Sequence, residues 1–89
     1  MLQKEVTIIN KLGLHARAAA KLVTLASSFS SEIDICKGQQ TVNGKSIMGV
    51  MMLAASRGTS LIIRIDGADE TEAASSLEAL VLDKFGEAE

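Results

Sequence analysis

The sequence predicts an α+β domain in two layers, a single sheet of four strands with helices covering one face. Short segments of alternating apolar residues predict the strands, and segments with apolar residues every three or four positions predict the helices. These segments follow one another in the order βαββαβα, without a repeat or a linker. A chain of 89 residues with 47% hydrophobic content has room for one core. We therefore expect one domain over residues 1–89.

The N-terminal part of the chain contains the first strand, a glycine-containing turn and the first helix. Residues 5–9 alternate in hydropathy, and this directs Val6 and Ile8 toward the core. After the turn at residues 10–14, residues 16–26 are nearly all strong helix formers. Apolar residues at helical spacing define one face of this helix: Ala19, Leu22, Val23 and Ala26. We expect this face to pack against the sheet.

The middle of the chain contains two strands joined by a tight turn. Residues 32–36 alternate strictly, and Cys36 falls on the outward face of the strand. Residues 37–40 have the composition of a hairpin turn, which leads into a short strand at residues 41–42. Because Cys36 lies on a strand with no partner cysteine, a structural role is favoured over a redox role.

The second helix is unusual because it has almost no polar face. Ser46 occupies the N-cap position before a short apolar helix from residue 47 to about residue 54. Its spacing places Val50 and Leu53 in the core. Three other apolar side chains are then left at least partly exposed: Ile47, Met48 and Met51. Complete burial of the helix is one interpretation, and a docking patch that accommodates several partners is the other.

The C-terminal part of the chain contains the fourth strand and the last helix. Residues 60–65 alternate, and the next segment places Asp69 and Glu72 in the layout of a capping box. An apolar stripe then continues to Phe85, where the helix is expected to end. The acidic residues 87–89 are expected to form a solvated tail.

The only histidine of the chain, His15, stands where the first helix begins. The first N–H groups of a helix have no internal partner and carry a partial positive charge, so this end can hold a phosphate. The same charge disfavours a protonated imidazole and leaves a neutral nitrogen able to attack phosphorus. Arg17 could pair with the same anion in bidentate fashion. The hypothesis is a histidine that carries a phosphoryl group, and the alternative is an ordinary cap or surface histidine.

Composition excludes several classes of function. A formal net charge of −2, with no tryptophan or tyrosine, argues against nucleic acid as a partner. No apolar run approaches the ~20 residues that span a bilayer, so we expect no membrane insertion. One cysteine and one histidine provide neither an internal disulfide nor a metal site. We expect a cytoplasmic protein that needs no metal or cofactor.

Two separate segments resemble one family. Residues 13–17, Gly-Leu-His-Ala-Arg, followed by an alanine-rich helix, resemble the active-site signature of HPr, the histidine-containing phosphocarrier of the bacterial sugar phosphotransferase system. Residues 43–51 resemble its second helix and serine site. The resemblance covers nearly the whole chain and implies an open-faced sandwich whose antiparallel sheet has the strand order 1-4-2-3. Where the family usually has proline, this chain has Ala18, which should loosen the start of the helix slightly without removing the phosphate site.

The resemblance implies a stoichiometric carrier rather than an enzyme. His15 would accept a phosphoryl group from phosphorylated enzyme I and pass it to an enzyme IIA domain. The Ala16 and Arg17 backbone N–H groups and the guanidinium would hold the phosphate. The resemblance also implies that Ser46 is phosphorylated by an HPr serine kinase/phosphorylase, and we expect a monomer. Partners would dock on a patch made of Ala16, Ala20, Ile47, Met48 and Met51.

Other functions remain open at this level. The nitrogen-branch carrier resembles this chain at residues 10–13 and would use the same histidine to relay phosphate to regulators. A small acyl phosphatase has a similar size and layering, and would release inorganic phosphate. A structural interaction module would explain the methionine-rich helix but would leave His15 and Arg17 without a role.

Overall fold

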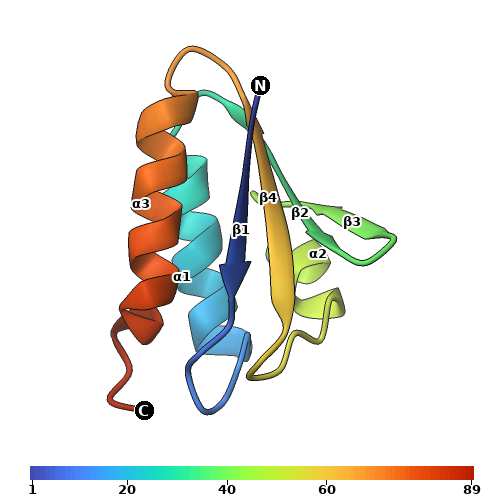
Figure 1. The fold of residues 1–89 in the computed structure, drawn as a ribbon, viewed down its shortest axis with the longest axis vertical. Helices are drawn as coiled ribbons and strands as arrows, with labels where there is room; N and C mark the ends of the chain where they lie inside the picture. Colours follow the sequence, from blue (N-terminus) through green and yellow to red (C-terminus); the bar gives the residue numbers. More distant parts are fainter.

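The chain folds as a sheet with helices packed against one face, and the computed structural model describes all 89 residues (Figure 1). The strands are β1 (Leu2–Thr7), β2 (Glu32–Lys37), β3 (Gln40–Asn43) and β4 (Ser60–Asp66). The helices are α1 (Ala16–Ser27), α2 (Ile47–Met52) and α3 (Glu70–Leu82), and a 3₁₀ turn, η1, follows at Lys84–Gly86. The predicted βαββαβα order is confirmed. No helix combines the length and the apolar character that crossing a membrane requires.

The sheet has the strand order β1-β4-β2-β3, and every neighbouring pair is antiparallel. This confirms the order that the family resemblance implied. Val6 of β1 pairs with Leu61 of β4, and both side chains are buried. β1 ends earlier than predicted, but Ile8 is still fully buried in the core, and its N–H donates to the Thr59 carbonyl at 2.9 Å.

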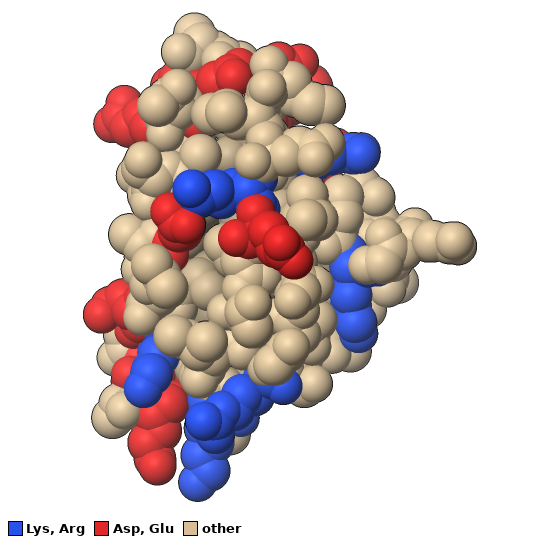
Figure 2. Space-filling view, viewed as in Figure 1, with Lys and Arg blue, Asp and Glu red and all other residues tan.

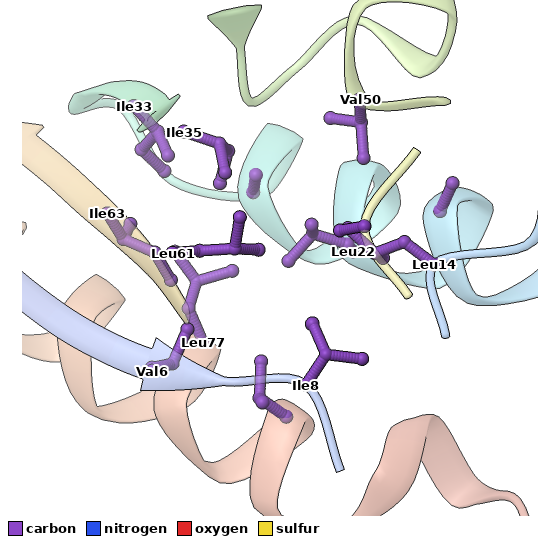
Figure 3. Close-up of a cluster of buried hydrophobic side chains, with 14 of the residues drawn as sticks. Val6, Ile8, Leu14, Leu22, Ile33, Ile35, Val50, Leu61, Ile63 and Leu77 are labelled. Atoms are coloured by element: carbon purple, nitrogen blue, oxygen red, sulfur yellow. The ribbon is translucent and has the colours of Figure 1, made fainter. Parts of the chain in front are cut away.

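The core lies between the sheet and the helices and contains 20 buried side chains (Figure 3). It joins the inward residues of the strands to Leu22 of α1, Val50 of α2 and Leu77 of α3. Cys36 lies outside the core cluster, as expected for the outward face of β2, but only 8% of it is exposed. The reason is its position in β2, which is paired on both sides, with Ile62 of β4 and with Thr41 of β3.

The start of α3 differs from the predicted capping box. Asp69 occupies the N-cap position, but its carboxylate makes no bond to the helix. It reaches back to the end of the α1–β2 connection, where it accepts hydrogen bonds from the N–H groups of Ser30 (2.9 Å) and Ser31 (3.0 Å) and from the Ser31 hydroxyl. Asp69 therefore joins two turns that are distant in sequence. The local pattern could not reveal this, because its partners lie 38 and 39 residues away.

Asp69 should make the stability of the fold depend on acid pH. The hydrogen bonds from Ser31 and Ser30 lower the pKa of its carboxyl from 3.8 to about 2. The ionised carboxylate thus contributes stability that is present above its ordinary pKa and is lost as the pH falls toward about 2. As the pH falls across this range, urea unfolding should show that Asp69→Asn loses less stability than wild type loses. At neutral pH the variant should be less stable than wild type. Parallel pH curves for the two proteins would contradict this role.

Candidate phosphoryl-accepting site

The backbone holds His15 at the start of α1. Gly13 adopts φ +68°, a conformation that glycine accepts most readily, and this turns the chain into the helix. Leu14 is buried, and its N–H donates to the Ala55 carbonyl at 2.8 Å. His15 follows as the N-cap residue with an extended backbone, and its side chain makes no capping bond. The backbone on either side of His15 therefore sets the position of the imidazole, and no capping bond occupies its nitrogens.

The groups predicted to hold a phosphate are available at this end of α1. The Ala19 N–H donates to the His15 carbonyl at 2.8 Å, so the earlier Ala16 and Arg17 N–H groups precede the first helical bond. Arg17 is exposed and takes part in none of the ion pairs of the chain. The side chain of His15 is 30% exposed. An anion at His15 can thus be reached by the helix N-terminus and by a free guanidinium.

The C-terminal tail is solvated only in part: Ala88 and Glu89 are exposed as predicted, but Glu87 covers part of this site. The side chain of Glu87 is only 15% exposed, and its Oε2 contacts Nε2 of His15. Its Oε1 accepts a hydrogen bond from Asn10 Nδ2 at 2.9 Å. The tail is also held by backbone bonds, since the Lys11 N–H donates to the Glu89 carbonyl at 2.9 Å. Figure 1 shows the C terminus at the same end of the molecule as the turn before α1.

The charges around His15 are mixed. An open hollow at this site is lined by Lys11, His15, Arg17 and Lys21 together with residues 86–89. In Figure 2, basic side chains gather at this end of the molecule, with acidic ones beside them. The hydrogen bonds from Asn10 and then His15 lower the pKa of Glu87 below its usual value, so its carboxylate is ionised at neutral pH.

No group of three or more His, Cys, Asp or Glu side chains is arranged to hold a metal ion.

The apolar side chains expected on the second helix are exposed. Met48 is 69% exposed, and Ile47 and Met51 also reach the surface, whereas Val50 and Leu53 are buried as predicted. α2 packs against α1, where Ala16 is exposed and Ala20 is partly exposed. The structure thus brings the expected patch residues to two neighbouring helices.

On α2 and on the turn before His15, two further apolar side chains are exposed that were not expected from the sequence. Met52, the last residue of α2, is 68% exposed, and Leu12 is 66% exposed on the turn before His15. α2 ends at Met52 and does not continue to residue 54 as predicted. The exposure of Leu12 could have been predicted, because it is a single apolar residue in a turn beside the histidine. Asn10 and Glu87 carried no such signal, because 77 residues separate them.

The family model described as "PTS HPr component phosphorylation site" matches residues 2–83. The chain belongs to the HPr family. Phosphocarrier protein HPr of Cupriavidus necator is 54% identical over the full length of both chains. The phosphocarrier protein NPr of Shewanella violacea is 45% identical and is matched over 98% of this chain and 96% of its own.

Solved HPr structures have the same fold. The crystal structure of HPr-C-His from Thermoanaerobacter tengcongensis superposes with a TM-score of 0.96 at 46% identity, covering both chains completely. A crystal structure of an HPr dimer from the same organism gives a TM-score of 0.79 at 47% identity, over 98% of this chain and all of that chain. The strand order and the three-helix layer described above are therefore those of HPr.

Ser46 stands at the start of a different helix from His15 in this HPr-family chain. It is the N-cap of α2, and its hydroxyl accepts a hydrogen bond from the Gly49 N–H at 3.2 Å. Its side chain is partly exposed and immediately precedes the exposed residues Ile47 and Met48. A charge added at Ser46 would therefore lie beside the apolar surface of α2.

Proposed function

We propose that this chain carries a phosphoryl group on His15, accepting it from phosphorylated enzyme I and passing it to an enzyme IIA domain. The observation that carries the proposal is the state of the imidazole: Nε2 faces Glu87, while Nδ1 makes no hydrogen bond at the start of α1. A carboxylate only accepts hydrogen bonds, so Nε2 bears the hydrogen and Nδ1 of the neutral ring keeps its lone pair. Nδ1 is thus the acceptor atom.

The transfer requires positioning and charge neutralisation more than bond activation by this chain. The N–P bond of the donor phosphohistidine breaks as the bond from phosphorus to Nδ1 forms. Ala16 and Arg17 N–H groups and the Arg17 guanidinium face the charge of the phosphoryl oxygens. Because these donors are exposed, a partner can approach the bound phosphoryl group and remove it again. This is the behaviour of a carrier and not of an enzyme.

Enzyme I and the enzyme IIA domain would dock on the exposed patch of α1 and α2. This patch combines flexible methionine side chains with small alanines, and such a surface adapts to different partners. We add Leu12 and Met52 to the residues expected from the sequence, because both are exposed. The buried, unpaired thiol of Cys36 fits a reducing cytoplasm.

Incubation with enzyme I and labelled phosphoenolpyruvate tests this function. We expect one phosphoryl group per chain, with the acid lability and base stability of a phosphohistidine. The label should move to an added enzyme IIA domain. An unlabelled chain, or an acid-stable label, would overturn the proposal. Release of inorganic phosphate from an acyl phosphate would support the acyl phosphatase alternative instead.

We also propose that phosphorylation of Ser46 by a serine kinase regulates the carrier. Ser46 is partly exposed, and the helix N-terminus beside it favours an added negative charge. The same charge would lie next to Ile47 and Met48, where it would have to be desolvated when a partner docks. The expected effect is weaker docking with an intact fold.

Replacing Ser46 with aspartate should slow phosphoryl exchange with enzyme I by roughly tenfold, because a charge at the rim of an interface lowers the rate of association. The matched control is Ser46→Ala, which loses the bond to Gly49 and about 1 kcal/mol of stability but keeps its exchange rate. Initial rates of labelling at limiting enzyme I provide the measurement. Equal rates for wild type and Ser46→Asp would count against this regulation.

The similarity to NPr supports a second candidate, a carrier of the nitrogen branch. It would use the same chemistry at His15 and differ only in its partners. Labelling with the enzyme I of each branch, at equal concentrations, distinguishes the two. We expect faster labelling by the enzyme I of the sugar branch, because the Ser46 segment resembles that form.

A further inference from the structure

The C-terminal tail brings a buried polar pair to the reactive histidine. Asn10 is completely buried, and its Nδ2 donates both to the Gly13 carbonyl (2.8 Å) and to Glu87 Oε1 (2.9 Å). Both contacts are acceptors, so the orientation of the amide is determined: its NH₂ group faces Glu87 and its oxygen points away. The Asn10 oxygen has no hydrogen-bond partner at all. A buried polar atom without a partner costs stability, and its retention calls for an explanation other than stability.

The other oxygen of Glu87 contacts His15 Nε2. The three side chains therefore form a directed chain, in which Asn10 donates to Glu87 and Glu87 accepts from His15. The backbone bond between Lys11 and Glu89 and the bond from Lys21 Nζ to the Phe85 carbonyl (2.7 Å) hold the tail on both sides of Glu87. Hydrogen bonds on both sides of Glu87 thus hold the tail segment that carries it against the site.

We infer that Glu87, oriented by Asn10, is a positioning residue that keeps the hydrogen of His15 on Nε2 and the lone pair on Nδ1. The inference rests on the proposed function of His15. When Nδ1 forms its bond to phosphorus and the donor imidazole leaves with the N–P electron pair, His15 keeps its Nε2 hydrogen and becomes a cationic ring. No proton has to move. The carboxylate beside Nε2 faces the positive charge that develops on the ring, and so favours the phosphorylated state.

This arrangement predicts that Glu87→Gln changes which nitrogen of His15 carries the hydrogen. The Asn10 NH₂ group can only donate, so the oxygen of the new amide must turn toward it. The NH₂ group of the new amide then faces His15 Nε2, which has to become the acceptor, and the hydrogen moves to Nδ1. The variant has almost the same size as wild type, but blocks the nitrogen that receives the phosphoryl group. The matched control is Glu89→Gln, since Glu89 takes part in the tail only through its backbone carbonyl.

Nitrogen-15 NMR of the unphosphorylated proteins at alkaline pH, where the ring is neutral, measures the tautomer directly. We expect the Nε2–H form in wild type and in Glu89→Gln, and a shift toward the Nδ1–H form in Glu87→Gln. Labelling by enzyme I should show a fall in kcat of roughly tenfold for Glu87→Gln with little change in KM, because the ring is blocked while docking is intact. Thermal unfolding should confirm that the variant is folded.

The possible outcomes separate this inference from the proposed function. An unchanged tautomer in Glu87→Gln would overturn the positioning role, whatever the labelling rate. A shifted tautomer with a wild-type labelling rate would also overturn it, because the tautomer would then not govern transfer. If wild type accepts no phosphoryl group, the proposed function fails and this inference fails with it, even where the tautomer shifts as expected.

Discussion

Replacing His15 with alanine should abolish labelling by enzyme I, with a loss of at least about 10³-fold, while the protein stays folded. The loss follows from removal of the nucleophile, since no other histidine exists in the chain. The fold should persist because the imidazole is partly exposed and makes no capping bond to α1. Phosphohistidine labelling and circular dichroism on the same samples provide the measurement.

A second variant, His15→Gln, controls for the contact with the tail. Its side-chain amide can still donate to Glu87, so the tail should keep its place, but it has no nucleophilic nitrogen. Both variants should remain unlabelled, and His15→Gln should retain more of the wild-type thermal stability. Labelling of either variant would place the phosphoryl group on another residue and would reject His15 as the carrier.

The second large effect is expected at Gly13, which shapes the turn before His15. Its φ is +68°, and a Cβ at this position would lie 2.6 Å from the Ala55 carbonyl oxygen and 2.9 Å from Ser56 Cα. Both neighbours are backbone atoms and cannot move away as a flexible side chain could. Gly13→Ala should therefore lower the free energy of unfolding by about 3 kcal/mol, from backbone strain and steric overlap together. Urea unfolding measures this loss.

Gly38→Ala is the matched control for Gly13→Ala. Gly38 also has a positive φ, +59°, but a Cβ there would meet no atom within 4 Å. It should lose only about 1 kcal/mol, the cost of the left-handed conformation alone. Gly13→Ala should in addition slow the labelling of His15, because the displaced turn carries the imidazole with it. Equal losses of stability in the two variants would show that the close approach of the backbone at Gly13 has no energetic consequence.

The local elements of this protein could be predicted from sequence because their signals are local. The alternation in β4, the helical spacing in α1 and the serine N-cap of α2 each depend on residues within a few positions of one another. The same holds for the position of His15 at a helix start and for the exposure of Met48, which follows from the spacing of Val50 and Leu53. The strand order came from the family resemblance and not from these patterns.

What the sequence by itself determined, then, is a histidine at the N-terminus of a helix with an arginine beside it and an apolar second helix nearby. The tertiary structure decided which groups surround that histidine. Asp69 bonds to the α1–β2 connection and not to its own helix, and Glu87 covers the Nε2 edge of His15 and does not extend into solvent. The physical reason is the same in both cases. A carboxylate binds whichever donors the fold brings to it, and here those donors come from segments 38 to 77 residues away.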